Sequence, residues 1–253
     1  MTELESPKTT DKTPRIARLL TILIQPRRTF AALAGESGAS WLSPMLALSL
    51  SALLSTAVGG YVKAQAALMG NAPLPPDWQY WTPDMQNNYM QGQQSMQGPV
   101  FVYILPIVGA LLGLWFGWLV LGGILHLGST LLGGRGSMSG ALNVAAWAWM
   151  PFLLRDLLRA IYMPMAGHAI VSAGLSGFAP NAVFLAQIFS RVDIFFLWSA
   201  ILLVIGLGAA DGLSRGKSAA AVLVVLLLLL LAQAGIGTLS AGIGGMVAGN
   251  PLF

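Results

Sequence analysis

Residues 192–222 read VDIFFLWSAILLVIGLGAADGLSRGKSAAAV, two apolar runs separated by a short polar turn. The first run carries no charge between Asp193 and Asp211, and the second continues without charge to Val247. A helix that crosses the hydrocarbon core of a bilayer needs about 20 predominantly apolar residues. The stretch therefore predicts two membrane-spanning helices, 192–212 and 219–247, joined by a tight turn.

The composition of the whole chain agrees with a membrane protein. Of its 253 residues, 56% are hydrophobic and only 9% are charged, whereas an ordinary soluble domain has about 25% charged residues. Only helices and closed barrels satisfy all backbone hydrogen bonds in lipid, and the alternating pattern of a membrane barrel is absent. The sequence therefore predicts an all-α integral membrane protein.

Three further apolar runs precede the first two and give a prediction of five transmembrane helices. They cover residues 41–62, 99–127 and 139–162. We expect residues 1–40 to form a cytoplasmic N-terminal segment and residues 41–253 to form the membrane domain. Within that domain, residues 63–98 form a long polar outer loop. Residues 163–190 are uncharged, and they either lie on the membrane surface or lengthen the fourth span.

The N-terminal segment contains a second kind of helix. Ile16, Leu19, Leu20 and Leu23 follow the i, i+3, i+4, i+7 spacing of one apolar helix face, which predicts an amphipathic helix at the membrane interface. Pro26 ends this helix. Four basic residues are expected to contact anionic lipid head groups on the inner face: Arg15, Arg18, Arg27 and Arg28.

The basic residues also predict the orientation of the chain. With the N-terminus inside, the inner side holds nine Lys and Arg residues and the outer side holds four. An excess of basic residues marks the cytoplasmic side. We therefore expect the N-terminus inside the cell and the C-terminus outside.

Three stretches resemble the Yip family, membrane proteins named for their interaction with Ypt/Rab GTPases, in its bacterial form. They are LLTILIQPRRTFAAL (19–33), LLGGRGSMSGALNVAAWAWMPFLL (131–154) and the 192–222 stretch, with Asp193, Trp198, Gly206 and Lys217 at family positions. The resemblance implies five spans, a cytosolic N-terminus and a place in a bacterial cytoplasmic membrane. It does not imply Rab binding, because the N-terminal signature of the eukaryotic trafficking members is missing.

Five charged residues occur within or beside the predicted third and fourth spans. They are Arg155, Asp156, Arg159, Arg191 and Asp193. Arg155 lies about 24 Å along the third span, near the outer boundary of a ~30 Å core. Arginine reaches the interface easily from such a depth. We expect an outer-side ion-pair network here, and the alternative is part of a path for a substrate or an ion.

Small residues recur every four positions in the second and fifth spans. These helix-packing candidates are Gly109, Gly113 and Gly117, followed by Gly237, Ala241, Gly245 and Gly249. Such spacing allows helix backbones to approach closely. The partner helix belongs either to the same chain, which we expect, or to another.

The sequence predicts no catalytic, cofactor or metal site and no nucleic-acid partner. In GLSRGKS, three residues separate Gly212 from Gly216, one fewer than a phosphate-binding loop needs. His126 and His168 stand apart from any acidic cluster. We therefore expect a membrane-organising or partner-recruiting scaffold that is not an enzyme, and a small transporter or channel is the alternative. Its partners would be the lipid bilayer and a second copy or another membrane protein.

Overall fold

The computed structural model describes residues 15–35, 40–69, 74–75, 77–170, 172–179 and 182–248. Helices make up most of these residues, and none of them lies in a β-strand. The chain is therefore all-helical over the part that the structure describes.

Four helices are long and apolar enough to cross a membrane. They are α3 (Leu42–Leu68), α5 (Leu105–Leu131, preceded by a π-helical turn at Val100–Ile104), α9 (Ile194–Asp211) and α10 (Arg215–Ala248). They correspond to the first, second, fourth and fifth predicted spans. The hairpin predicted from residues 192–222 is formed by α9 and α10, and it turns at Gly212 in a left-handed conformation.

The third predicted span, 139–162, is not one continuous helix. It falls on α6 (Met138–Ala148) and α7 (Met150–Ala166), of 11 and 17 residues, which are separated at Trp149. Pro151 lies in the first turn of α7. Because proline has no backbone N–H and its ring crowds the preceding turn, it favours a break or a kink at this position.

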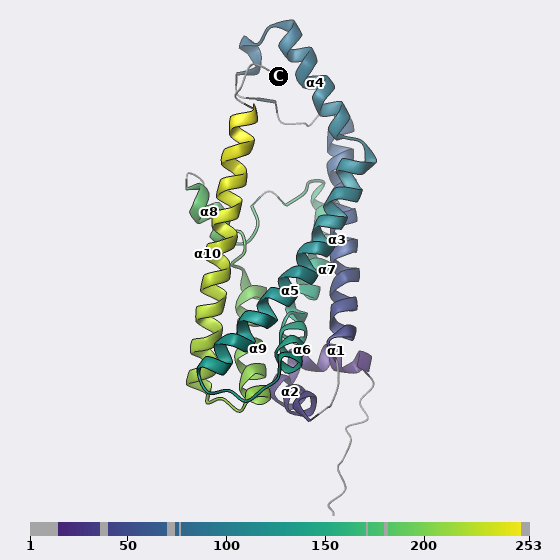
Figure 1. The fold of residues 1–253 in the computed structure, drawn as a ribbon. Helices are drawn as coiled ribbons and strands as arrows, with labels where there is room; N and C mark the ends of the chain where they lie inside the picture. The colour runs from purple at the N-terminus through teal and green to yellow at the C-terminus, as the bar shows by residue number, and fades with distance from the viewer. Residues whose placement is uncertain are drawn as a thin grey trace, which may run out of the picture.

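The remaining helices are short. They are α1 (Arg15–Ile24), α2 (Pro26–Ala34), α4 (Pro83–Met96) and α8 (Val183–Phe189), with 3₁₀ turns at Trp78–Tyr80 and Ser176–Phe178. In Figure 1, α3 and α10 run along the long axis of the molecule, α5 crosses obliquely between them, α1 lies across one end, and α4 lies at the other. We call the end with α1 and α2 the inner end and the end with α4 the outer end.

The densest part of the core lies at the inner end. Phe30 of α2, Met45 of α3, Trp118 of α5, Trp147 of α6 and Leu202 of α9 are all buried there. The bundle is therefore held together where the N-terminal helices meet the spans.

The helix α1 differs from the predicted amphipathic helix in where its apolar residues point. Ile22 is fully buried and Leu19 and Leu23 pack on the core, so this face contacts the protein. Leu20 and Ile24 are 63% and 79% exposed and point away from it. The predicted single apolar face is therefore divided between the bundle and the outside of the molecule.

The predicted outer loop, 63–98, contains more structure than a loop. The helix α3 continues to Leu68, and α4 occupies much of the rest. The rings of Trp78, Trp81 and Tyr89 pack against one another in edge-to-face or tilted pairs, with ring centroids 5.5–5.7 Å apart.

On the other side of the bundle, α8 packs against α10. The segment 163–190 therefore does not lengthen α9, because its helix α8 ends before α9 begins.

Candidate functional site

A cavity of about 770 Å³ lies between α3, α5, α7, α9 and α10. Its lining is mostly apolar, but Arg155, Asp156, Arg159 and Arg191 reach it at the outer end. We call it the arginine cavity. It brings four of the five predicted charged residues to one site.

The fifth residue, Asp193, joins the group through Arg155. Arg155 Nη1 lies 3.7 Å from Asp193 Oδ2, and Arg155 Nε lies 3.6 Å from Asp156 Oδ1. The same guanidinium lies 4.4 Å above the ring of Phe152, a cation–π contact. One arginine therefore faces two carboxylates and an aromatic ring.

Asp156 is buried and is held from α3. Ser51 Oγ donates a hydrogen bond to Asp156 Oδ2 at 3.4 Å. This contact links the two helices α3 and α7, which pack side by side. The sequence analysis did not single out Ser51, because a serine in an apolar helix carries no signal of its partner.

The other two arginines lie differently from the prediction of mutual ion pairs. Arg191 Nη1 donates to the backbone oxygen of Gln187 at 2.8 Å and lies 3.4 Å from the Gln187 Oε1. Arg159 lies within electrostatic reach of Asp156 and Asp193. Among the described residues, no carboxylate lies within 4.0 Å of Arg159 or Arg191. The expected contact of Arg191 with an acidic residue is therefore not found.

Asp193 has a second role in local structure. Its Oδ1 accepts a hydrogen bond from the backbone N–H of Phe196 at 2.8 Å and so caps the N-terminus of α9. A carboxylate at this place satisfies a free backbone donor and complements the positive end of the helix dipole. Asp193 therefore fixes the start of α9, and the same contact holds its carboxylate in place beside Arg155.

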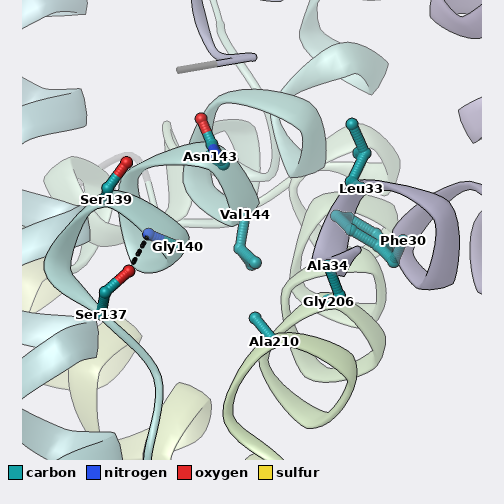
Figure 2. A pocket seen from close by; sticks show the side chains of 10 residues that line it. All are labelled: Phe30, Leu33, Ala34, Ser137, Ser139, Gly140, Asn143, Val144, Gly206 and Ala210. Atoms are coloured by element: carbon teal, nitrogen blue, oxygen red, sulfur yellow. Dashed lines mark hydrogen bonds between the residues drawn. The ribbon is translucent and has the colours of Figure 1, made fainter. Parts of the chain in front are cut away.

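A smaller pocket of about 330 Å³ lies at the inner end (Figure 2). Figure 2 shows Phe30 and Leu33 of α2 on one side and Ser139 and Asn143 of α6 on the other. Asn143 Oδ1 accepts hydrogen bonds from the backbone N–H groups of Ser40 and Trp41, at 3.1 and 3.0 Å. These bonds attach the start of α3 to α6.

The four predicted lipid-contacting arginines lie in α1 and α2. Arg27 and Arg28 are exposed at the start of α2, and Arg18 is half-buried. Arg15 begins α1, and its side chain lies outside the described part of the structure. The two arginines at the start of α2 are therefore the clearest candidates for contact with head groups.

The small residues that recur every four positions do not all pack against one helix. No described atom lies within 4 Å of a Cβ placed at Gly109 or Gly113, so the expected internal packing is not found at these positions. A Cβ at Gly117 would touch Trp149 at 3.4 Å, and one at Gly237 would lie 2.6 Å from Gln187 Oε1. The side chains at Ala241 and Gly245, and all of Gly249, lie outside the described residues.

Close packing at glycine occurs elsewhere. A Cβ at Gly206 of α9 would lie 2.7 Å from Phe30 Cε1 and 2.7 Å from Val144 Cγ1. Only a residue without a side chain leaves room for Phe30 at this point. This contact, and not a repeated spacing, places α2 against α9.

The comparison with protein families covers most of the chain. The family model for the Yip1 domain matches residues 20–237. The chain belongs to the Yip1 family. This match runs from α1 to α10 and confirms the resemblance that the three stretches carried. No curated protein and no solved structure matches the chain.

Family membership and the apolar helices together establish a membrane protein of the Yip1 type. The Yip1 family is not a known enzyme family. In the described residues, no group of three or more His, Cys, Asp or Glu side chains could hold a metal ion.

Proposed function

We propose that the chain is a membrane-organising scaffold with five spans, whose α1 and α2 lie in the head-group layer and gather anionic lipids. The observation that carries this proposal is the pair of exposed apolar residues on α1, Leu20 and Ile24, beside the exposed Arg27 and Arg28 of α2. Apolar residues next to cationic ones on helices that lie across the bundle are typical of a membrane interface. No catalysis is part of the proposed role.

The contacts between helix ends support a crossing by α6 and α7, the third predicted span. The backbone N–H of Arg135, just before α6, donates to the backbone oxygen of Asp211 at the end of α9, at 3.2 Å. At the other end, Arg155 of α7 meets Asp193 at the start of α9. The pair α6–α7 therefore runs antiparallel to α9 over the same thickness, and α9 is long enough to cross a membrane.

The distribution of basic residues supports the orientation. The inner end holds the exposed Arg27, Arg28, Arg135 and Arg215, and Lys217 lies there as well. Lys217 Nζ donates to the backbone oxygen of Leu132 at 2.9 Å, so the α5–α6 and α9–α10 turns lie together. We propose that this end faces the cytoplasm, that residues 1–40 form the cytoplasmic segment and that the C-terminus lies outside.

The scaffold has a further surface for partners within the membrane. Gly109 of α5 is exposed, no described atom would lie within 4 Å of a Cβ at this position, and small residues in a span allow the close approach of another helix. A second copy of the chain or another membrane protein would pack there. In a bacterial cell, this would be in the cytoplasmic membrane.

The depth of α1 and α2 in the membrane tests the proposal. Nitroxide labels at Ile24→Cys and Arg28→Cys, in chain reconstituted in anionic bilayers, report collisions with oxygen or with a water-soluble nickel complex. We expect oxygen to reach residue 24 preferentially and the nickel complex to reach residue 28. Equal access of the nickel complex to both labels would contradict the proposed interfacial position.

A small transporter is the second candidate, and the arginine cavity favours it. A cavity that reaches charged residues inside a membrane is typical of a substrate path. This alternative requires solute or ion flux in liposomes that contain only this chain. Reproducible flux that is abolished by Arg191→Gln in a folded protein would contradict the scaffold role and support transport.

A further inference from the structure

We propose that the arginine cavity binds one anionic phospholipid from the outer side of the bundle. Its phosphate would lie against Arg159 and Arg191, and one acyl chain would lie between α5 and α10. This goes beyond the scaffold role, because it makes a lipid part of the bundle at the end opposite to α1 and α2.

The charges of the cavity are unbalanced. Arg155, Arg159 and Arg191 bring three positive charges, and Asp156 and Asp193 bring two negative ones, so the group has a net charge of +1. Both carboxylates lie close to Arg155, at 3.6 and 3.7 Å. The other two arginines are left without an ion pair among the described residues.

The hydrogen bonding of the three arginines in the cavity is also incomplete. The buried Nε of Arg155 has no hydrogen-bond partner among the described atoms, since 3.6 Å to Asp156 is too long for a hydrogen bond. Arg191 uses one nitrogen on Gln187. A buried guanidinium donor that lacks a hydrogen-bond partner is costly. An anionic oxygen cluster such as a phosphate would satisfy several of them together.

The apolar part of the cavity determines which kind of anion fits. From the arginines it continues along residues of α5 and α10: Leu114, Val120, Leu226, Leu229 and Leu230. A free inorganic anion would leave these side chains facing empty or hydrated space. A head group with an attached acyl chain covers both the charged and the apolar part, and the volume of about 770 Å³ lies in the range of ligand sites.

Gly113 and Gly117 make room for the chain. Both line the cavity, and a Cβ at Gly113 would meet no described atom within 4 Å. The position therefore accepts a large side chain without a clash, and this side chain would fill the place of the acyl chain. Gly109, one turn earlier on α5, is equally open but does not line the cavity. It provides a matched control.

The test is native mass spectrometry of the full chain in detergent, with equal amounts of phosphatidylglycerol and phosphatidylcholine of the same acyl chains. We expect one phosphatidylglycerol to stay bound in preference to phosphatidylcholine. Replacing Arg159→Gln together with Arg191→Gln should weaken its retention by about tenfold or more, because charge-assisted hydrogen bonds are lost. Gly113→Phe should also abolish it by filling the apolar part.

The controls separate this site from general attraction to the surface. Arg215→Gln removes an exposed charge at the inner end, and Gly109→Phe adds the same ring outside the cavity, so both should retain the lipid. If the double arginine variant does not fold, Gly113→Phe still decides the matter. Equal retention of both lipids, retention unchanged by Gly113→Phe, or full competition by inorganic phosphate alone would overturn the proposal.

Discussion

Arg155 of α7 and Asp193 at the start of α9 form an ion pair across two helices, with 3.7 Å between Nη1 and Oδ2. Asp193 is at the same time the N-cap of α9. The pair therefore fixes the second turn of α7 against the start of α9. It also positions the guanidinium that faces Asp156 at the wall of the arginine cavity.

We expect the two residues to be energetically coupled. A double-mutant cycle with Arg155→Gln and Asp193→Asn, read from the free energy of unfolding in detergent, should give a coupling of about 0.5–3 kcal/mol. Asparagine keeps the N-cap, so the cycle isolates the ion pair. As a control, Arg155→Gln and Arg215→Gln should be additive. An additive Arg155–Asp193 cycle would show that the contact does not stabilise the bundle.

The cap of α9 should be measurable separately. Asp193→Ala loses the cap, the ion pair and the negative charge at the start of α9, whereas Asp193→Asn keeps the cap and loses only the charge and its ion pair. We expect the alanine variant to be less stable by about 1 kcal/mol, the usual contribution of a side-chain cap. Equal stability of the two variants would mean that the hydrogen bond to Phe196 contributes nothing measurable.

The contact of α2 with α9 should depend on Gly206. Gly206→Val would bring a side chain against Phe30 and Val144, and we expect a loss of about 1–3 kcal/mol in the free energy of unfolding. Phe30→Ala alone should also destabilise the bundle, but the loss caused by Gly206→Val should be smaller in that background, because the ring that clashes is removed. Gly109→Val, in open space on α5, is the matched control and should have little effect. A similar loss in both variants would contradict the close packing at Gly206.

Single cysteines should report the number of spans, because the chain has none of its own. An impermeant thiol reagent on intact cells should label Gln94→Cys and His168→Cys, and it should label Ser214→Cys only after permeabilisation. All three residues are exposed. Protection of His168→Cys in intact cells would contradict a crossing by α6 and α7.

Much of the bundle could be predicted because a long run of apolar residues is a strong signal of a membrane-spanning helix. The runs that became α3, α5, α9 and α10 can be read directly from the sequence. The break at Trp149 was missed, since a proline in an apolar run is compatible with a continuous membrane helix. The helix α4 was also missed, although Thr82, Pro83 and Asp84 are a typical helix start that the sequence displays.

The candidate site was harder to predict than the fold. The rarity of charge drew attention to Arg155, Asp156 and Asp193, and the structure brings these three together. Spacing alone could not show that Arg191 bonds to Gln187, that Gly109 is exposed or that Gly113 lines the arginine cavity. These outcomes depend on how one helix rotates against another, and a single sequence does not contain that information.

The preference of the protein for anionic lipid at its inner face tests the scaffold role most directly. Electron spin resonance with spin-labelled phosphatidylglycerol and phosphatidylcholine measures which lipid is enriched next to the reconstituted chain. We expect phosphatidylglycerol to be enriched. Arg27→Gln together with Arg28→Gln should reduce this enrichment, since each basic residue near the surface contributes about 1 kcal/mol. The matched change Lys63→Gln, at an exposed position outside α1 and α2, should leave it unchanged. No enrichment, or the same enrichment after the double change at Arg27 and Arg28, would contradict the account.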